Sequence, residues 1–329
     1  MTLNVFVAST PLQLISCAEA RGHYRCPDES CLLVIARPDN RVTETQVAFL
    51  LEQLGLQGVQ TIYLRKSTFY LRLSSVFRQL SGRQIDRLFI GNQSSWIHEV
   101  FYLGLSWKQL VFVDDGLATV KYYHAIHSEG LASRVTADKR RLLGRLGIHL
   151  HRVVPDRVSF FTCFPLESSD KVDVATHDFP VFRQTFQPEH EGRQGAPLVG
   201  FIGQPFGGED RLTQMQSQVR HVVERHPGAK IVYFMHRKER RRELKQALLG
   251  LPIELRSSPR WPIEVEVALS REPYVAFYSF TSTALFTLKK IFPELPVYQI
   301  DDAILAAKLP FYDEIQSMFR GIGVETTRL

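Results

Sequence analysis

Short apolar segments typical of β-strands alternate with helix-forming segments along most of the chain, and this alternation restricts the possible folds strongly. In the first half, helical or polar stretches separate five such segments: LNVFVAS, SCLLVIA, VQTIYL, DRLFIG and QLVFVDDG. Runs of this length and composition predict strands. Because strands that alternate with helices form parallel sheets covered on both faces, the chain is expected to be an α/β protein.

One interruption of this alternation predicts a domain boundary. Residues 155–195 are rich in proline and polar residues, and we interpret them as an irregular interdomain linker. Strand and helix patterns then restart and give the further strand segments PLVGFIGQP, AKIVYFMH, YVAFYSF and LPVYQI. The expected domains are residues 1–190 and 191–329. Two successive Rossmann-like halves are the outline of the GT-B architecture, in which two such domains face each other across a cleft.

Composition and charge restrict the class of protein. With 329 residues, 44% of them hydrophobic, the chain suits two globular domains. It has no apolar run long enough to span a membrane and begins without the basic segment of a secretory signal, which predicts a cytoplasmic protein. Neither G-x-G-x-x-G nor G-x-x-x-x-G-K-[ST] is present, which argues against dehydrogenases and P-loop proteins. The four cysteines lack the spacing of a zinc site, so no metal is expected.

The net charge of +6 favours an anionic partner and is concentrated in two segments. ADKRRLLGRLGIHLHR, residues 137–152, has the pattern of a basic amphipathic helix that suits an anionic membrane surface. HRKERRRELK, residues 236–245, is the second cluster. Charge alone would equally suit a nucleic-acid-binding protein, which is kept as an alternative.

Polar residues follow several of the predicted strands, where open α/β sheets bind their ligands. FVDDGLAT places Asp114 and Asp115 directly after a strand and before Gly116. Such a carboxylate can act as a general base or bind a cation. SFTST, residues 279–283, lies between a strand and a helix, where hydroxyls and free N–H groups form an anion site.

The ordered set of motifs resembles the bacterial sialyltransferases and polysialyltransferases with D/E-D/E-G and H-P motifs, most closely the lipooligosaccharide sialyltransferase family. The matching segments span nearly the whole chain: STPLQL, FVDDGLAT, FIGQP, YFMHRKE, PIEVEV and YSFTSTALFTLKKIFPELPVYQI. One position departs from the family, because Arg237 follows His236 where the family has proline. The literal His226-Pro227 pair precedes its strand and is interpreted as a helix-ending turn.

The resemblance implies an inverting, metal-independent glycosyltransferase without a cofactor. It would move sialic acid, or a related nonulosonic acid, from a CMP-activated donor to a hydroxyl of a surface glycan. Residues 1–190 would form the acceptor side and residues 191–329 the CMP-donor side. The acceptor would be a glycan or glycolipid such as lipooligosaccharide or a capsule precursor, presented at the inner membrane, where the protein would attach peripherally.

The resemblance also implies roles for individual residues. Asp115 or Asp114 would be the general base, and we favour Asp115 because Gly116 allows the acceptor to approach. Some family members use an acid after the G-x-P turn, which here would be Glu209 or Asp210. The remaining acceptor-binding candidates are Thr10 and Gln13.

His236 would assist the departure of CMP. Glu264 would bind the ribose hydroxyls, and Arg237 is a possible phosphate ligand. The other donor-binding candidates are Gly203, Gln204, Pro205, Thr281, Ser282 and Thr283.

Two further enzyme classes fit the same residues. A GT-B transferase could use CMP-Kdo or a UDP-sugar, and a hydrolase could bind a metal at Asp114 and Asp115.

Overall fold

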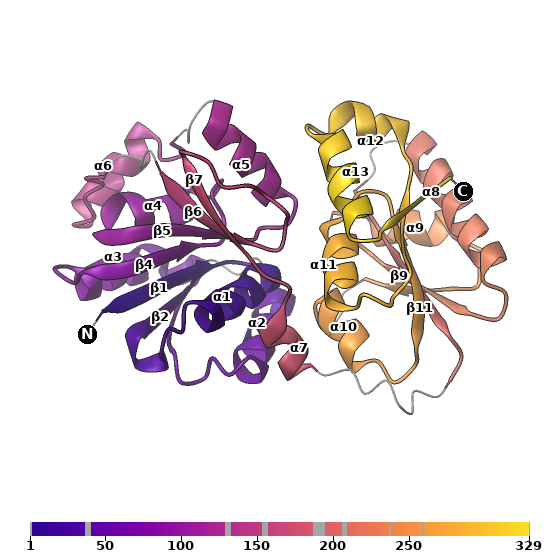
Figure 1. Cartoon of the computed structure of the whole chain (residues 1–329), viewed down its shortest axis with the longest axis horizontal. Helices are drawn as coiled ribbons and strands as arrows, with labels where there is room; N and C mark the ends of the chain where they lie inside the picture. The colour runs from indigo at the N-terminus through magenta and orange to yellow at the C-terminus, as the bar shows by residue number, and fades with distance from the viewer. Residues whose placement is uncertain are drawn as a thin grey trace. The chain divides into compact units, whose positions relative to one another are not determined.

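The computed structural model describes residues 2–36, 41–128, 133–152, 157–186, 195–205, 209–236, 238–257 and 260–328. They form two α/β units, Met1–Thr185 and Phe186–Leu329 (Figure 1). The division therefore lies between residues 185 and 186, whereas the sequence placed it between 190 and 191. Within the described ranges, no helix has both the length and the apolar character needed to cross a membrane.

Unit 1 is built on a seven-stranded sheet with the order β3-β2-β1-β4-β5-β6-β7, and all neighbouring strands are parallel. Its strands are β1 Leu3–Ala8, β2 Cys31–Ala36, β3 Gln60–Leu64, β4 Ile85–Ile90, β5 Trp107–Val113, β6 Val158–Thr162 and β7 Val172–Thr176. The chain leaves β1 for β2 and β3 on one side and returns to β4 on the other. The carboxyl ends of β1 and β4 therefore meet at the topological switch point, where sheets of this kind bind ligands.

The helices of unit 1 begin where the local sequence provides start signals. They are α1 Pro11–His23, α2 Arg41–Gln53, α3 Phe69–Leu80, α4 Trp96–Gly104, α5 Ala118–Ser128, α6 Ala137–Arg145 and α7 Pro180–Thr185, with 3-10 turns at Asp28–Ser30 and Lys66–Thr68. Thr10 caps α1, since its Oγ1 accepts a hydrogen bond from the Gln13 N–H at 3.3 Å. Proline at the first helical position has the φ angle that a helix needs there.

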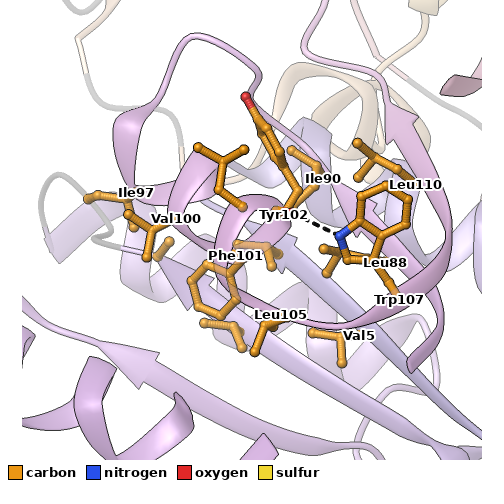
Figure 2. Close-up of a cluster of buried hydrophobic side chains, with 14 of the residues drawn as sticks. Val5, Leu88, Ile90, Ile97, Val100, Phe101, Tyr102, Leu105, Trp107 and Leu110 are labelled. Carbon is orange, nitrogen blue, oxygen red and sulfur yellow. Dashed lines mark hydrogen bonds between the residues drawn. The ribbon is translucent and has the colours of Figure 1, made fainter. Parts of the chain in front are cut away.

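A buried cluster holds α4 against the sheet of unit 1. Figure 2 shows Val5, Leu88 and Leu110 of the strands together with Val100 and Phe101 of α4. The indole N–H of the first residue of β5 donates to the last turn of α4, because Trp107 Nε1 lies 2.9 Å from the Tyr102 carbonyl oxygen. These contacts fix β5, and with it the acid pair that follows the strand.

The prediction of an irregular linker over residues 155–195 was wrong for residues 157–186. This part of the chain adds β6, β7 and α7 to unit 1. Every residue of β6 is buried beside β5, so its five-residue run VSFFT is a core strand. The prolines indicate boundaries here, and Pro180 is the first residue of α7.

Unit 2 is built on a six-stranded parallel sheet with the order β10-β9-β8-β11-β12-β13. Its strands are β8 Leu198–Ile202, β9 Lys230–Phe234, β10 Ile253–Arg256, β11 Tyr274–Ser279, β12 Val297–Ile300 and β13 Glu325–Thr327. Its helices are α8 Glu209–Arg225, α9 Arg241–Ala247, α10 Ile263–Leu269, α11 Thr283–Ile291, α12 Ala303–Lys308 and α13 Tyr312–Gly321. The switch point lies between β8 and β11. Both units are Rossmann-like, which confirms the predicted α/β class.

Candidate functional site

The two acids that end β5 have different environments, and Asp114 is buried. Its side chain is only 1% exposed. The Thr162 hydroxyl donates to Asp114 Oδ1, and the Cys163 N–H donates to Oδ2 at 2.8 Å. His177 Nε2 lies 3.2 Å from the same Oδ2. These contacts join the carboxyl ends of β5 and β6 to the segment after β7, so Asp114 is placed to stabilise the sheet.

Asp115 is half-buried and is held by Gln13. Gln13 Nε2 donates to Asp115 Oδ1 at 2.5 Å, while its Oε1 accepts the Ser9 N–H at 2.7 Å. The second contact fixes the orientation of the amide, because the acceptor end must face Ser9. The Asp115 N–H donates to Thr119 Oγ1 at 2.9 Å, and Gly116 follows with φ of 68°, a conformation that favours glycine.

A row of polar residues is joined to Gln13 through Ser9. His98 Nδ1 accepts the Asn92 N–H at 3.2 Å, so the neutral ring carries its proton on Nε2. Nε2 then donates to Ser9 Oγ at 2.7 Å, and Ser9 Oγ donates to the Ala36 carbonyl oxygen at 2.7 Å. Burial lowers the pKa of His98 to about 3, which keeps the ring neutral.

This row lies at the switch point of unit 1. A Cβ atom added to Gly91, directly after β4, would lie 2.9 Å from Gln13 Cγ. The Gly91 N–H also donates to the Val7 carbonyl oxygen at 2.9 Å. The absence of a side chain at this position therefore lets Gln13 lie across the ends of β1 and β4 and reach Asp115.

In unit 2, residues after β8 and β11 meet at the second switch point. Gln204 Nε2 donates to the Thr281 carbonyl oxygen. Thr281 is 7% exposed, and its Oγ1 accepts from Gln299 Nε2 at 3.0 Å. Pro205 is exposed. The structure thus brings together the predicted donor-binding segments FIGQP and SFTST.

The turn after β9 orients His236. Glu239 Oε2 accepts the His236 N–H at 2.6 Å, and Glu239 Oε1 accepts from the Tyr233 hydroxyl at 2.7 Å. His236 Nδ1 accepts the Lys238 N–H at 3.1 Å, so the neutral imidazole carries its proton on Nε2. Burial raises the pKa of Glu239, and a Cβ atom on Gly203 would lie 2.2 Å from its Oε2. Gly203 is thus needed for this close packing.

The start of α11 contains the other hydroxyls of the predicted phosphate site. Ser282 is the N-cap and accepts the Ala284 N–H at 3.3 Å, and Thr283 is the first helical residue. One helical turn further on, the Thr287 hydroxyl donates to Glu264 Oε1 at 2.6 Å. Burial raises the pKa of Glu264, whose side chain is 6% exposed. The contact places α10 beside α11 and puts Glu264 close to the predicted phosphate site.

Within each unit, the structure brings most of the predicted site residues together. In unit 1, Gln13 joins Thr10 of the α1 cap to Asp115 and Gly116. In unit 2, the group is formed by Gly203, Gln204, Glu264, Thr281, Ser282 and Thr283. Arg237 and the side chains of Glu209 and Asp210 lie outside the described residues.

Several polar partners were missed by sequence reasoning. They are Ser9, Asn92, Thr119, Thr162, His177, Glu239, Thr287 and Gln299. Five of these belong to motifs that were recognised, although no role was given to them: Ser9, Thr119, Glu239, Thr287 and Gln299. Position after a predicted strand could also have indicated Asn92, whereas no local pattern distinguishes Thr287 or Gln299.

Neither a protein-family model nor a curated protein matches the sequence. Solved structures do match. The UDP-GlcNAc 2-epimerase from Neisseria meningitidis bound to UDP-GlcNAc has a TM-score of 0.51 and 12% identity, covering 96% of this chain and 85% of that chain. The 2,6-sialyltransferase from Photobacterium sp. JT-ISH-224, in a ternary complex with CMP and lactose, has a TM-score of 0.53 and 14% identity, covering 99% and 78%. The GT-B domain of the Photobacterium damselae sialyltransferase has a TM-score of 0.52 and 11% identity, covering 99% and 98%. At such low identities, these structural matches establish the fold alone. They confirm the predicted GT-B class.

Proposed function

We propose that this protein is an inverting, metal-independent glycosyltransferase that uses a CMP-activated sialic acid or related nonulosonic acid. The acceptor is the hydroxyl of a surface glycan, such as lipooligosaccharide or a capsule precursor, and the protein is cytoplasmic. The observation that carries the proposal is the half-buried carboxylate of Asp115 at the carboxyl end of β5, held by Gln13 and followed by Gly116. The likeness of fold to two sialyltransferases supports it.

Unit 1 supplies the general base in this proposal. Asp115 takes the proton of the acceptor hydroxyl as its oxygen attacks the anomeric carbon of the donor sugar. Asp114 has all of its described contacts inside the sheet and is 1% exposed, which favours Asp115 over its neighbour. Gln13 is a positioning residue, because it acts on the substrate through the carboxylate that it holds.

Unit 2 supplies the donor site in this proposal. His236 Nε2–H donates to the phosphate of CMP and stabilises the negative charge that develops as the sugar departs. The hydroxyls of Thr281, Ser282 and Thr283, at the start of α11, bind the same phosphate. Glu264 accepts hydrogen bonds from the ribose hydroxyls. Since these groups supply the charge stabilisation that CMP needs to leave, the proposed reaction requires no metal.

A second nucleotide sugar is the alternative, either CMP-Kdo or a UDP-sugar. Because the fold is similar to that of a UDP-GlcNAc 2-epimerase, a UDP-sugar should also be tested as the donor. The same phosphate and ribose contacts would serve either nucleotide, because they do not read the base. Binding of CMP and UDP therefore has to be compared directly.

The test measures CMP release from CMP-sialic acid in the presence of a chelator, with and without a galactose-terminated acceptor. Wild type is compared with Asp115→Asn and His236→Ala. The matched controls are Asp138→Asn and His149→Ala, which change exposed residues of unit 1. Release that requires the acceptor, persists in chelator and is lost only in the first two variants supports the proposal.

Two results would contradict it. Release that stops in chelator and returns with a divalent cation would favour a metal-dependent reaction. If no release occurs, and UDP but not CMP raises the melting temperature, the donor is a UDP-sugar instead.

A further inference from the structure

Helices α3 and α6 of unit 1 lie side by side although Leu80, the last residue of α3, and Ala137, the first of α6, are 57 positions apart. Ser74 Oγ of α3 donates to the Leu146 carbonyl oxygen, directly after α6, at 2.9 Å. At the other end, Trp96 packs edge-on against Phe69 of α3, and Lys139 Nζ of α6 lies 4.8 Å from the centre of the same indole ring. The two helices therefore run in the same direction and share one outer surface.

Apolar side chains are exposed on this surface. Leu71 of α3 is 76% exposed, Tyr70 beside it is 39% exposed, and Leu142 of α6 is 37% exposed. The buried residues of α3 are Phe69, Leu73, Val76, Phe77 and Leu80, so Leu71 lies on the opposite side of the helix. Burying these three side chains in an apolar environment would be favourable.

Exposed cationic residues lie on the same two helices as the exposed apolar side chains. Helix α6, ADKRRLLGR, contains four cationic residues and one acid, Asp138. Arg141 and Arg145 are both exposed and lie on one face, since they are four positions apart. On α3, Arg78 is exposed. It comes seven positions after Leu71, which is about two helical turns, so both residues lie on the same side of the helix. We call the surface formed by Tyr70, Leu71, Arg78, Arg141, Leu142 and Arg145 the α3/α6 face.

We propose that the α3/α6 face binds an anionic lipid bilayer. The apolar side chains would enter the headgroup region while the arginines contact the lipid phosphates, as in other interfacial helices. The sequence predicted a membrane contact from residues 137–152 alone, and the structure adds α3 and its more exposed leucine. The proposal is independent of the transferase reaction, because none of these residues belongs to the candidate site.

The combination of groups favours a bilayer over a nucleic acid. Phosphate backbones are bound by cations with hydrogen-bonding or stacking side chains, and an exposed leucine adds nothing to such contacts. A bilayer uses both the leucine and the arginines. Both kinds of residue should therefore contribute to binding.

The test is co-sedimentation of the whole protein with vesicles of phosphatidylcholine, with or without phosphatidylglycerol. Wild type should bind the anionic vesicles and not the neutral ones. Because each cation near an anionic surface contributes about 1 kcal/mol, neutralising Arg141 and Arg145 to glutamine should weaken binding about 30-fold. Leu71→Ser should weaken it about tenfold, through lost apolar burial.

Matched controls separate the surface from general charge and hydrophobicity. The double variant Arg241→Gln with Arg242→Gln removes two exposed cations of α9 in unit 2. Leu249→Ser removes a leucine of unit 2 that is 81% exposed. Both controls should bind anionic vesicles within about twofold of wild type, and melting curves should show that every variant is folded.

Three outcomes would overturn the proposal. The wild type could fail to bind anionic vesicles at low salt, or the controls could lose as much binding as the α3/α6 variants. The protein could also bind single-stranded DNA and not vesicles, with a loss in the arginine variant and none in Leu71→Ser. That result would identify the surface as a nucleic-acid site.

Discussion

Gln13 Nε2 donates to Asp115 Oδ1 at 2.5 Å, although 102 positions separate the two residues in the chain. The sequence resemblance implied that Gln13 contacts the acceptor. In the structure its Oε1 accepts from Ser9 and its Nε2 donates to Asp115, and the side chain is buried. We therefore infer that it positions the carboxylate, and the two roles differ in their kinetic consequences.

Gln13→Ala should lower kcat with little change in the acceptor KM. The variant removes the donor that fixes Asp115, and a small misplacement of a catalytic group can cost about a hundredfold in rate. Initial rates over a range of acceptor concentrations measure both constants. Gln53→Ala, at an exposed glutamine that ends α2, is the control. A large rise in acceptor KM at unchanged kcat would instead support direct acceptor binding.

The two adjacent acids should respond differently to the same substitution. Asp115→Asn should lower kcat by about 10² to 10⁴-fold and leave the melting temperature unchanged, because it removes the proposed general base. Asp114→Asn should destabilise unit 1 by about 1–3 kcal/mol, because the amide cannot accept from both Thr162 and Cys163 in the same way. Denaturant unfolding and turnover of both variants test this. Loss of turnover in folded Asp114→Asn, with active Asp115→Asn, would reverse the two assignments.

The sequence predicted the acid pair but could not distinguish its members. Strand β5 is buried on both faces over its last four residues, so an alternating pattern of polarity is absent. The partners that bury Asp114 are Thr162 and His177, 48 and 63 positions further along the chain. Both belong to the stretch that was interpreted as a linker, so misreading β6 also concealed the environment of the acid.

In unit 2 as well, strands and helices could be predicted from the local sequence, whereas contacts between residues far apart in the chain could not. Its strands were predicted because each is a short apolar run between polar segments, and a helix was expected directly after SFTST because strands and helices alternate there. The contact between Thr287 and Glu264 depends on how α10 packs beside α11. The contact between Gln299 and Thr281 depends on β12 pairing with β11. Neither contact could be predicted from a local sequence pattern.

Gly203→Ala should destabilise unit 2 by about 1–3 kcal/mol, the usual cost of overpacking. The new Cβ atom would lie 2.2 Å from Glu239 Oε2 and 2.8 Å from the Tyr233 ring, so the turn that orients His236 would have to move. Gly321→Ala is the matched control, because it lies in a helix with nothing within 4 Å of the added atom. Equal unfolding midpoints for the two variants would contradict the predicted clash.

Protonation of His98 should make stability depend on pH. Burial lowers its folded pKa to about 3, whereas the unfolded side chain titrates near 6.5. Between these values the unfolded chain binds a proton that the folded chain does not, so stability rises with pH across this interval. Acidification from about pH 7 to 5 should therefore cost about 2 kcal/mol through His98.

The measurement compares the free energy of unfolding at the two pH values for wild type, His98→Gln and the exposed-site control His149→Gln. Gln at 98 removes the titrating ring, so the difference between the two pH values should shrink by about the amount that His98 contributes. The control should keep the full difference. Identical pH dependence in all three proteins would mean that the ring is protonated in the folded state, and its acceptor role toward Asn92 would then be wrong.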